Sequence, residues 1–432
     1  MFAIFNYNCK VDIAILSIFA LSKLIQKEAI MVDFEIVKPL MNLYNRSLNA
    51  TNGKFKRYMH NKINWDVRLI GIKGARGIGK TTLMLQYIKD NFKNTNKAFY
   101  ASLDNLWFNQ YPLEELVEYL YNQGVEAIFL DEVHKLKNWQ QYIKNFYDGY
   151  PDLKIVYTGS AMLQIDNSKG DLSRRQSLYD FNGLSFREYL EFEHKLVLPV
   201  LTLSQILENH VQIASEIASQ IRILNAFDDY LRRGYYPFYK DAGADYYMRL
   251  SDMVKTVIDV DIPAVEGIEF ATLEKLKRLL MVISGTCPFE PNISRLSEQL
   301  QNSREHTLKM LNYLNNAGLV KCLYTPAKNY KKLSGPEKVF VNDSNLMYAL
   351  SQNIEQGTVR ETFFANQASV EHSVVIPKEG DFLVDDKYLF EVGGRSKTFR
   401  QIANIPDSFL AVADMEVGFG NKIPLWMFGM MY

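Results

Sequence analysis

The sequence lacks most features that are typical of secreted proteins, of proteins stabilised by a structural metal ion and of membrane-spanning proteins. Its three cysteines, Cys9, Cys287 and Cys322, lie far apart, and no two of them form a CxxC motif. This usage excludes a disulfide framework and a structural zinc site, and it predicts a reduced, cytoplasmic compartment. The uncharged stretch 13–21 is nine residues long, whereas a membrane-spanning helix needs roughly 20 apolar residues. We therefore expect no membrane partner.

The first residues also lack the marks of a secretion signal, namely a basic start and a small-residue cleavage site. We interpret residues 1–33 as an N-terminal extension outside the folded core, with Met31 as an alternative start.

An excess of charge of one sign is also missing. Lysine plus arginine and aspartate plus glutamate number 49 each, so no global field attracts nucleic acid or an anionic membrane. Any contact with nucleic acid must come from a local patch. The 432 residues, 47% of them hydrophobic, predict two to four globular domains with normal cores.

Apolar strand-like runs alternate with amphipathic helical patterns through the first part of the chain. An amphipathic helix is expected at 34–50, and four strands at 67–72, 98–103, 125–134 and 153–162. The connecting helices are expected at 81–92, 112–121 and 139–147. This alternation predicts an α/β fold with a doubly wound parallel sheet. Later helices are expected at 186–194, 203–227 and 246–257.

A glycine-rich loop follows the first predicted strand. It fits the pattern GxxxxGK[ST] at every position, with the residues Gly74, Ala75, Arg76, Gly77, Ile78, Gly79, Lys80 and Thr81. Glycines let successive backbone N–H groups face one anion, and the following helix adds its positive N-terminus. We expect Lys80 to reach the outer phosphates of ATP, and the Thr81 hydroxyl to bind Mg²⁺ with Thr82 nearby. The alternative is an ordinary glycine turn.

Acidic residues end the third predicted strand, in AIFLDEVH. Asp131 is expected to hold Mg²⁺ through a water molecule, and Glu132 to orient or deprotonate the attacking water. Two acids after a strand are common, but this spacing after a phosphate loop favours the functional interpretation. At the end of the next strand, Ser160 or Thr158 is expected either to sense the γ-phosphate or to cap a helix.

Together these motifs resemble the AAA-type ATPases of the AAA+ superfamily. More narrowly, the chain resembles a prokaryotic set of ATP-binding proteins that join this core to a winged helix and a PD-(D/E)XK nuclease-like domain. The stretches that carry the resemblance are FLDEVHKLKNW, YTGSAM, LSRRQSLYDFNGLSFREYL, YLRRGYYP, GDFLVD, KYLFEVGG and GNKIPLWMFGMMY, besides the glycine loop.

The resemblance implies a helical lid and an arginine that stabilises the transition state from a neighbouring subunit, so an oligomer is expected. Arg174 and Arg175 are candidates for this catalytic arginine, and Arg232 and Arg233 are the alternative. Residues 234–237 loosely resemble a glycine–x–proline signature near the adenine, with one additional tyrosine.

A helix–turn–helix pattern is predicted at 293–300 and 304–316, followed by a β-run. Ser303, Arg304, His306 and Lys309 would face outward from the second helix, toward a DNA groove. Few basic residues are present and Glu305 opposes phosphate binding, so a protein partner remains the alternative.

The C-terminal part resembles a PD-(D/E)XK nuclease domain, with Glu361, Asp381 and Glu391 as the acidic residues. Metal-assisted attack of water also needs a lysine two residues after the second acid. Gly393 occupies that position, which favours a domain that does not cleave. Arg395 or Lys397 is the substitute that an active site would need.

These expectations divide the chain into five parts: an extension at 1–33, a P-loop ATPase core at 34–190, a helical lid at 191–265, a winged helix at 266–330 and a small α+β nuclease-like domain at 331–432. The predicted activity is Mg²⁺-dependent ATP binding and hydrolysis, coupled to a partner that is DNA or protein. The alternatives are an ATP-gated DNA endonuclease and a nucleotide-sensing module without hydrolysis.

Overall fold

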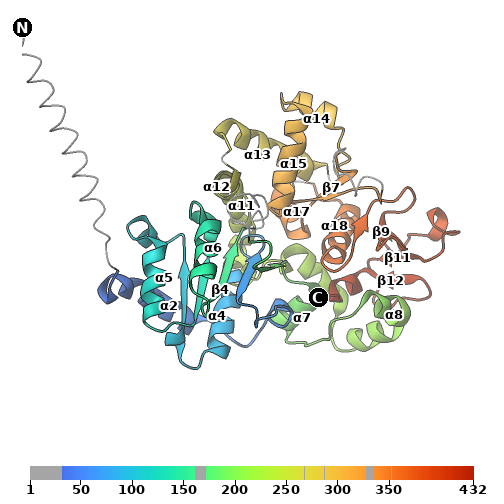
Figure 1. The fold of residues 1–432 in the computed structure, drawn as a ribbon. Helices are drawn as coiled ribbons and strands as arrows, with labels where there is room; N and C mark the ends of the chain where they lie inside the picture. Colours follow the sequence, from blue (N-terminus) through green and yellow to red (C-terminus); the bar gives the residue numbers. More distant parts are fainter. Residues whose placement is uncertain (1–31, 161–171, 267, 287, 327–334, 352) are drawn as a thin grey trace, which may run out of the picture.

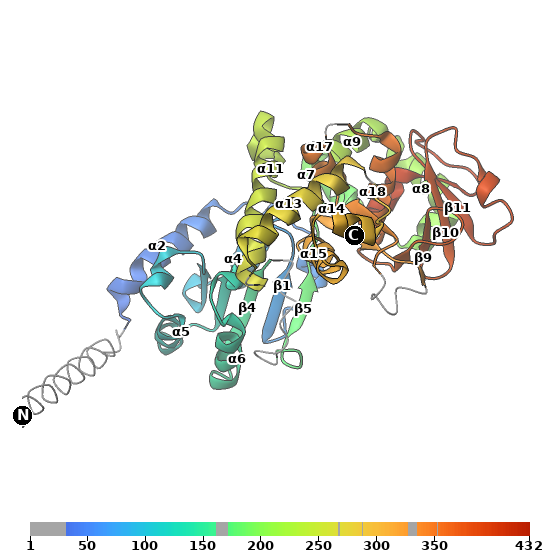
Figure 2. The same ribbon diagram turned by 90° about the horizontal axis from the view of Figure 1, so that it is seen from above.

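The computed structural model describes residues 32–160, 172–266, 268–286, 288–326, 335–351 and 353–432. Figures 1 and 2 show an N-terminal α/β unit on one side and a C-terminal unit on the other, with further helices between them. The predicted extension, residues 1–33, lies almost wholly outside the described residues.

The N-terminal unit contains a fully parallel sheet with the strand order β2-β3-β4-β1-β5. Its strands are β1 (Leu69–Lys73), β2 (Ala98–Ser102), β3 (Ala127–Asp131), β4 (Lys154–Gly159) and β5 (Ser177–Asp180). The first four are almost entirely buried, as expected for strands covered on both faces. The predicted doubly wound parallel sheet is therefore confirmed.

Helices cover both faces of this sheet. They are α2 (Phe34–Ala50), α3 (Met59–Lys62), α4 (Lys80–Asn91), α5 (Leu113–Asn122), α6 (Trp139–Gly149) and α7 (Phe186–His194), with the short turns η1 (Thr95–Lys97), η2 (Leu106–Asn109) and η3 (Val133–Lys135). Helix α2 packs on α4, and α5 packs on α6. These two helix pairs lie on opposite faces, as expected for right-handed connections between parallel strands. The phosphate loop follows β1 and therefore lies at the carboxyl edge of the sheet.

A helical region follows, consisting of α8 (Leu203–Ala218), α9 (Ile223–Asp229), η4 (Tyr230–Gly234), α10 (Tyr239–Ala242), η5 (Gly243–Asp245), α11 (Tyr246–Thr256), η6 (Val257–Asp261) and α12 (Ile262–Glu266). The single helix predicted at 203–227 is wrong, because α8 ends before Ser219. The Ser219 hydroxyl donates to the Glu216 carbonyl at 2.7 Å, which satisfies a carbonyl of the last turn.

The next elements are α13 (Phe270–Gly285), α14 (Ile293–Gln299), α15 (Arg304–Asn316), β6 (Val320–Leu323), β7 (Lys338–Val341) and α17 (Ser344–Leu350). Helix α14 packs on α15 across a short turn. The Ser303 hydroxyl caps α15 by accepting from His306 N at 3.1 Å. Strand β6 pairs antiparallel with β7, on the other side of the boundary predicted between 330 and 331.

The C-terminal unit contains a mixed sheet with the order β12-β11-β10-β9-β8. Its elements are α18 (Gln356–Ala368), β8 (Val374–Val375), β9 (Phe382–Val384), β10 (Tyr388–Gly393), η7 (Phe399–Gln401), β11 (Ser408–Val412), β12 (Lys422–Pro424) and η8 (Leu425–Met430). The hairpin predicted at 380–394 corresponds to the antiparallel pair β9–β10.

The C-terminal unit is tied to earlier parts of the chain. Helix α8 lies beside β12 and η8 (Figure 1), and His210 Nε2 is 2.9 Å from the Gly420 carbonyl. The Tyr432 backbone oxygen accepts from Ser185 Oγ at 2.7 Å and from Arg187 Nε at 2.8 Å.

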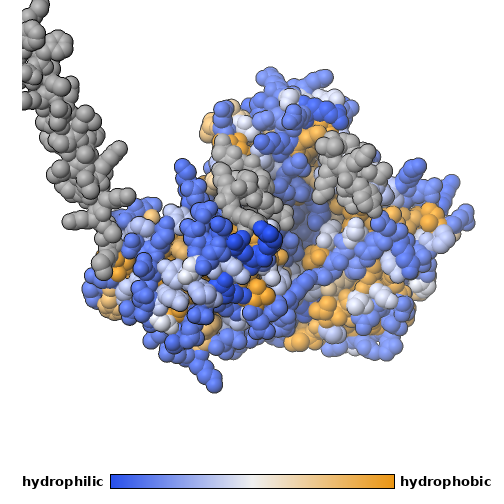
Figure 3. All heavy atoms as spheres, in the orientation of Figure 1, coloured by the Kyte–Doolittle hydropathy of each residue, from blue (hydrophilic) through white to orange (hydrophobic). Residues whose placement is uncertain are grey.

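The outer surface is mixed in character. Figure 3 shows hydrophilic residues over most of one face, with hydrophobic patches among them. Among the described residues, no helix has both the length and the apolar character needed to cross a membrane.

Candidate functional site

The glycine-rich loop lies between β1 and α4. Gly77 and Gly79 have φ values of 79° and 101°, in the left-handed region that favours glycine. A Cβ atom on Gly77 would lie 3.0 Å from the ring of Phe238, and one on Gly74 would lie 2.3 Å from the Phe181 carbonyl oxygen. The loop is therefore packed closely between β5 and the helical region, and its backbone has the curvature of an anion cradle.

Lys80, the first residue of α4, directs its side chain back to this loop. Its Nζ donates to the carbonyl oxygens of Gly74 and Ala75, both at 2.9 Å. Burial lowers the pKa of Lys80, while the negative charges of Glu132 and Asp131 oppose that shift. The cation is thus held next to the two acids predicted for the reaction.

Asp131, the last residue of β3, accepts hydrogen bonds from three hydroxyl groups. Thr81 Oγ1 is 2.5 Å and Tyr100 OH is 2.9 Å from its Oδ2, and Thr158 Oγ1 donates to its Oδ1. Burial, followed by the charge of Asp131, raises the pKa of Tyr100. The phenol is therefore a donor that orients the carboxylate.

A magnesium ion fits the pair formed by Thr81 and Asp131. Their side-chain oxygens converge from two elements, and Mg²⁺ prefers oxygen ligands, of which the protein supplies one or two beside phosphates and water. Among the described residues, no three His, Cys, Asp or Glu side chains group as an all-protein metal site. The arrangement suits a metal shared with a nucleotide.

Glu132 follows Asp131 in a left-handed conformation, with φ of 55°. This backbone geometry is uncommon for a residue other than glycine and is found at functional sites. Its amide donates to Thr158 Oγ1 at 3.2 Å, and its side chain is 22% exposed. A partly exposed carboxylate beside Lys80 is suited to contact a water molecule at the phosphate loop.

Residues 66–190 match the family model of an AAA domain. This match, the parallel sheet and the loop geometry support a P-loop ATPase fold of the AAA+ type. A second family model, a domain of unknown function (DUF8612), matches residues 224–357.

Two uncharacterized proteins of Methanocaldococcus jannaschii are similar in sequence. MJ1637 is 27% identical over 286 residues, which are 63% of this chain and 60% of that protein. MJ1544 is 21% identical over 364 residues, which are 81% of this chain and 75% of that protein. The alignment therefore spans less than two thirds of MJ1637.

Solved structures with some likeness include the Aeropyrum pernix ORC1 protein in complex with DNA, with 12% identity, a TM-score of 0.29, and coverage of 75% of this chain and 94% of that one. AMPPCP-bound DnaA from Aquifex aeolicus has 14% identity, a TM-score of 0.25, and coverage of 66% and 89%.

A buried arginine that the sequence analysis missed fastens the phosphate loop of the AAA domain. Arg57 Nη1 donates to the Ile78 carbonyl at 2.6 Å, and its Nη2 donates to Asn182 and Gly183 at 2.7 and 2.8 Å. Its Nε is 3.0 Å from both carboxylate oxygens of Glu188. No local sequence pattern identifies Arg57 as a functional residue. Apart from Ile78, its partners lie more than 120 positions away, on α7 and in the loop before it.

Asp261 was also missed, although it joins the helical region to the AAA domain. Its side chain is 3% exposed, with Lys135 Nζ 2.6 Å from Oδ1 and Arg76 Nη1 3.5 Å from Oδ2. Burial acts to raise the pKa of Asp261, but the interactions of its carboxylate with the nearby His134 ring and with Lys135 outweigh burial and lower the pKa. Asp261 is therefore an anion beside the phosphate loop.

The remaining predicted residues of the AAA domain lie around this centre in different ways. Thr82 is exposed on α4. Ser160 is buried, and its backbone amide donates to His134 Nδ1 at 3.3 Å. Of the two polar residues proposed at the end of β4, Thr158 is the one whose side chain contacts Asp131.

The four candidate arginines lie in exposed or half-exposed positions. Arg174 is exposed. Arg175 pairs with Asp148 of α6 at 3.0 Å, and Arg232 and Arg233 pair with the aspartates four positions earlier at 2.9 and 3.0 Å. None of these three ion pairs links an arginine to the phosphate loop. Phe238, directly after the loosely matched 234–237 signature, does contact the loop at Gly77.

The three C-terminal acids gather where α18 packs on the β9–β10 hairpin. Burial, together with the charge of Asp381, raises the pKa of Glu361 to about 7. Asp381 Oδ2 accepts from Val392 N at 2.7 Å, and Lys397 Nζ is 2.6 Å from Glu391 Oε1. Lys397 thus places a cation beside the acids from four residues beyond Gly393.

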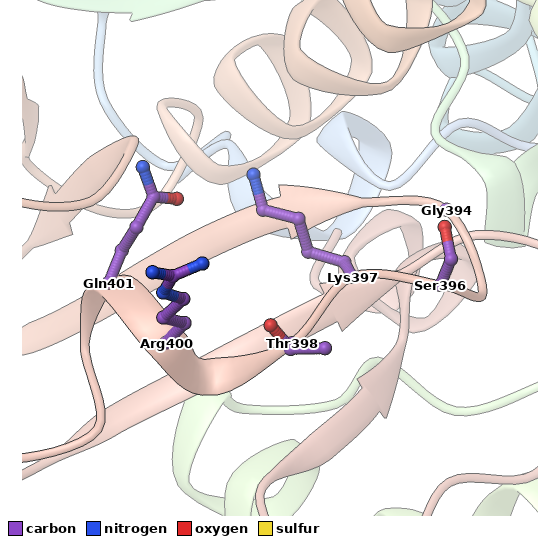
Figure 4. Close-up of a pocket in the computed structure, with 6 residues that line it drawn as sticks. All are labelled: Gly394, Ser396, Lys397, Thr398, Arg400 and Gln401. Atoms are coloured by element: carbon purple, nitrogen blue, oxygen red, sulfur yellow. The ribbon is translucent and has the colours of Figure 1, made fainter.

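Lys397 also lines a pocket of about 650 Å³ at this end of the unit. Figure 4 shows the polar ends of Lys397, Arg400 and Gln401 directed to the same side of this pocket. Arg395, the other substitute considered, is not among the pocket-lining residues.

Proposed function

We propose that this protein is a Mg²⁺-dependent ATPase whose nucleotide state is transmitted to a partner-binding region. The observation that carries the proposal is the 2.5 Å contact between Thr81 Oγ1 and Asp131 Oδ2, because it joins the phosphate loop to the acidic end of β3. Loop and acid on the same edge of the sheet are what ATP hydrolysis requires.

The chain's own groups have distinct tasks in this proposal. Backbone amides between Gly74 and Lys80 bind the phosphates, and Lys80 Nζ exchanges its carbonyl partners for phosphate oxygens. Thr81 and Asp131 hold Mg²⁺, which neutralises developing charge on the phosphates. Glu132 accepts the proton of the attacking water. Arg174 or Arg175 serves a neighbouring subunit, which makes the active form an oligomer.

Transmission to the rest of the chain is supported by two contacts on the loop. Phe238 and Met253 of the helical region lie against Gly77, and Ala75 is 3.4 Å from the position of a Cβ on Gly318, just after α15. A phosphate that displaces the loop therefore acts on both regions. The proposed units are those predicted at 34–190, 191–265, 266–330 and 331–432, except that β7 is assigned to the third unit with its partner β6, and the fourth unit begins after β7.

DNA is proposed as the partner of the helix–turn–helix, with protein as the alternative. Arg304 and Lys309 are exposed on α15, as is its N-cap Ser303, while His306 is half-buried. Two exposed cations on this helix support phosphate contacts but few base contacts.

The experiment is a phosphate-release assay on the full chain with Mg²⁺-ATP, with and without duplex DNA. Glu132→Gln should retain nucleotide binding in calorimetry and lose turnover, whereas Lys80→Ala should lose binding. Normal hydrolysis by Glu132→Gln would refute the general-base role. Tight binding without phosphate release by the wild-type chain would favour a nucleotide-sensing module instead.

A second candidate function, a metal-dependent DNA endonuclease gated by ATP, is favoured by the Lys397–Glu391 contact. The nuclease pattern expects a lysine at position 393, where this chain has glycine. Lys397 can supply the missing cation, because it contacts Glu391 close to Glu361 and Asp381. Incubation of plasmid DNA with Mn²⁺ tests it. Cleavage that disappears in Asp381→Ala would support a nuclease, and intact plasmid at all metal concentrations would leave a non-cleaving domain.

A further inference from the structure

His134 occupies a buried position that the proposed reaction does not yet use. It belongs to η3, directly after β3, and its side chain is 1% exposed. Its Nδ1 accepts a hydrogen bond from the Ser160 amide at 3.3 Å. Because an accepting ring nitrogen carries no proton, the neutral ring has its single proton on Nε2.

The Nε2 atom lies between two carboxylates. It is 3.4 Å from Glu132 Oε2 and 3.6 Å from Asp261 Oδ1, and within the described part of the chain it makes no hydrogen bond. A buried donor without a partner is unfavourable, so a small shift toward either acid is favoured. One N–H group cannot serve both acids in the same geometry.

The two acids belong to different bodies of the fold. Glu132 and His134 are on the same connection after β3, so their spacing is set locally. Asp261 is on η6, which continues α11, and Met253 of α11 lies against Gly77 of the phosphate loop. A displacement of this helical segment therefore changes the distance from Nε2 to Asp261 but not the connection to Glu132.

We infer that His134 is a positioning residue whose Nε2–H orients Glu132 toward the attacking water, and that Asp261 competes for this N–H when the helical segment is seated on the loop. The inference rests on the proposed role of Glu132 in ATP hydrolysis. It makes the helical segment a brake on turnover that acts through one hydrogen bond.

Two substitutions separate the two nitrogens of the ring. The amide of glutamine places a donor near the position of Nε2, whereas the side chain of asparagine places an acceptor near Nδ1 and lacks the Nε2 donor. We expect His134→Gln to keep kcat within about threefold, and His134→Asn to lower it about 10- to 100-fold. The Kd of a fluorescent ATP analogue should be unchanged in both.

The opposite ranking would assign His134 a structural role through Ser160 and overturn the inference. So would an equal kcat in the wild-type and asparagine variants, while the wild type still hydrolyses ATP. A wild-type chain that binds ATP without hydrolysing it would instead overturn the proposed function, and this inference with it. The ¹⁵N shifts of the imidazole test the proton's position independently of turnover, and a proton on Nδ1 would also refute it.

The competition with Asp261 is tested by a double-mutant cycle. Asp261→Asn should raise kcat when residue 134 is histidine and leave it unchanged in the His134→Asn background. Asp261→Ser, too short to reach Nε2, carries the same expectation if the asparagine variant fails to fold. A kcat no higher than wild type, or the same change in both backgrounds, would refute the brake.

Discussion

Replacing Arg57 with alanine should destabilise the AAA domain more than the removal of any exposed arginine. The Arg57 side chain is 6% exposed and that of Glu188 is fully buried. Removing the guanidinium leaves the Glu188 charge and the carbonyl oxygens of Ile78, Asn182 and Gly183 without this donor. Breaking a buried ion pair by removing one partner costs about 3–5 kcal/mol.

The expected change in melting temperature follows from that free energy. A unit of this size loses about 2–4 °C for each kcal/mol, so the first unfolding transition should fall by about 6–20 °C. Scanning calorimetry on the full chain measures it. Arg46→Ala, at an exposed position of α2, is the matched control and should shift the transition by less than about 2 °C.

A partial rescue strengthens the test. Glu188 also accepts from the Tyr58 and Ser185 amides at 2.6 and 3.2 Å, and Glu188→Gln keeps one acceptor oxygen while removing the charge. The double variant Arg57→Ala/Glu188→Gln should therefore unfold at a higher temperature than Arg57→Ala alone. If the unfolding temperature of Arg57→Ala lies within about 2 °C of the wild-type value, the buried ion pair does not stabilise the phosphate loop as inferred here.

Other predictions concern single features. Gly77→Ala should weaken ATP binding at least tenfold in calorimetry, because the left-handed φ of 79° and the Phe238 ring 3.0 Å away both oppose a Cβ; wild-type affinity would refute this. The pKa of Glu361, raised to about 7, means that its contribution to stability is present below pH 4.5 and is lost as the pH rises to 7. Urea unfolding of Glu361→Gln should therefore lose less stability than wild type between pH 4.5 and 7, and parallel profiles would contradict the shift. Arg304→Ala with Lys309→Ala should weaken DNA binding in fluorescence titrations and flatten its salt dependence, whereas unchanged slopes would favour a protein partner.

Local patterns were sufficient for the buried strands of the AAA domain. In β1 and β3 every residue is buried, so an apolar run bounded by polar or glycine residues marks each strand. Strand β5 was missed because its residues are half-buried or exposed at the sheet edge, where the apolar signal is weak. The break between α8 and α9 was missed because the apolar spacing continues across it.

The residues of the candidate site also fall into those that a local pattern predicts and those that it does not. The phosphate loop and the acids after β3 are contiguous motifs, and their residue types can be identified from spacing alone. Arg57, Tyr100 and Asp261 act through partners that are distant in sequence, and a single arginine, tyrosine or aspartate carries no local signal. Lys397 was considered only as a substitute, since its closeness to Glu391 depends on the turn after β10.

The attachment of α8 to the last strands has a practical consequence for dissecting this protein. A fragment that stops after the helical region would leave the α8 face that meets β12 and η8 in water, together with the α7 groups that hold residue 432. Such a fragment should aggregate even though its ATPase motifs are complete. The segment from Ser185 to α8 and the last strands are therefore expected to depend on each other, and assays of nucleotide chemistry should use the full chain.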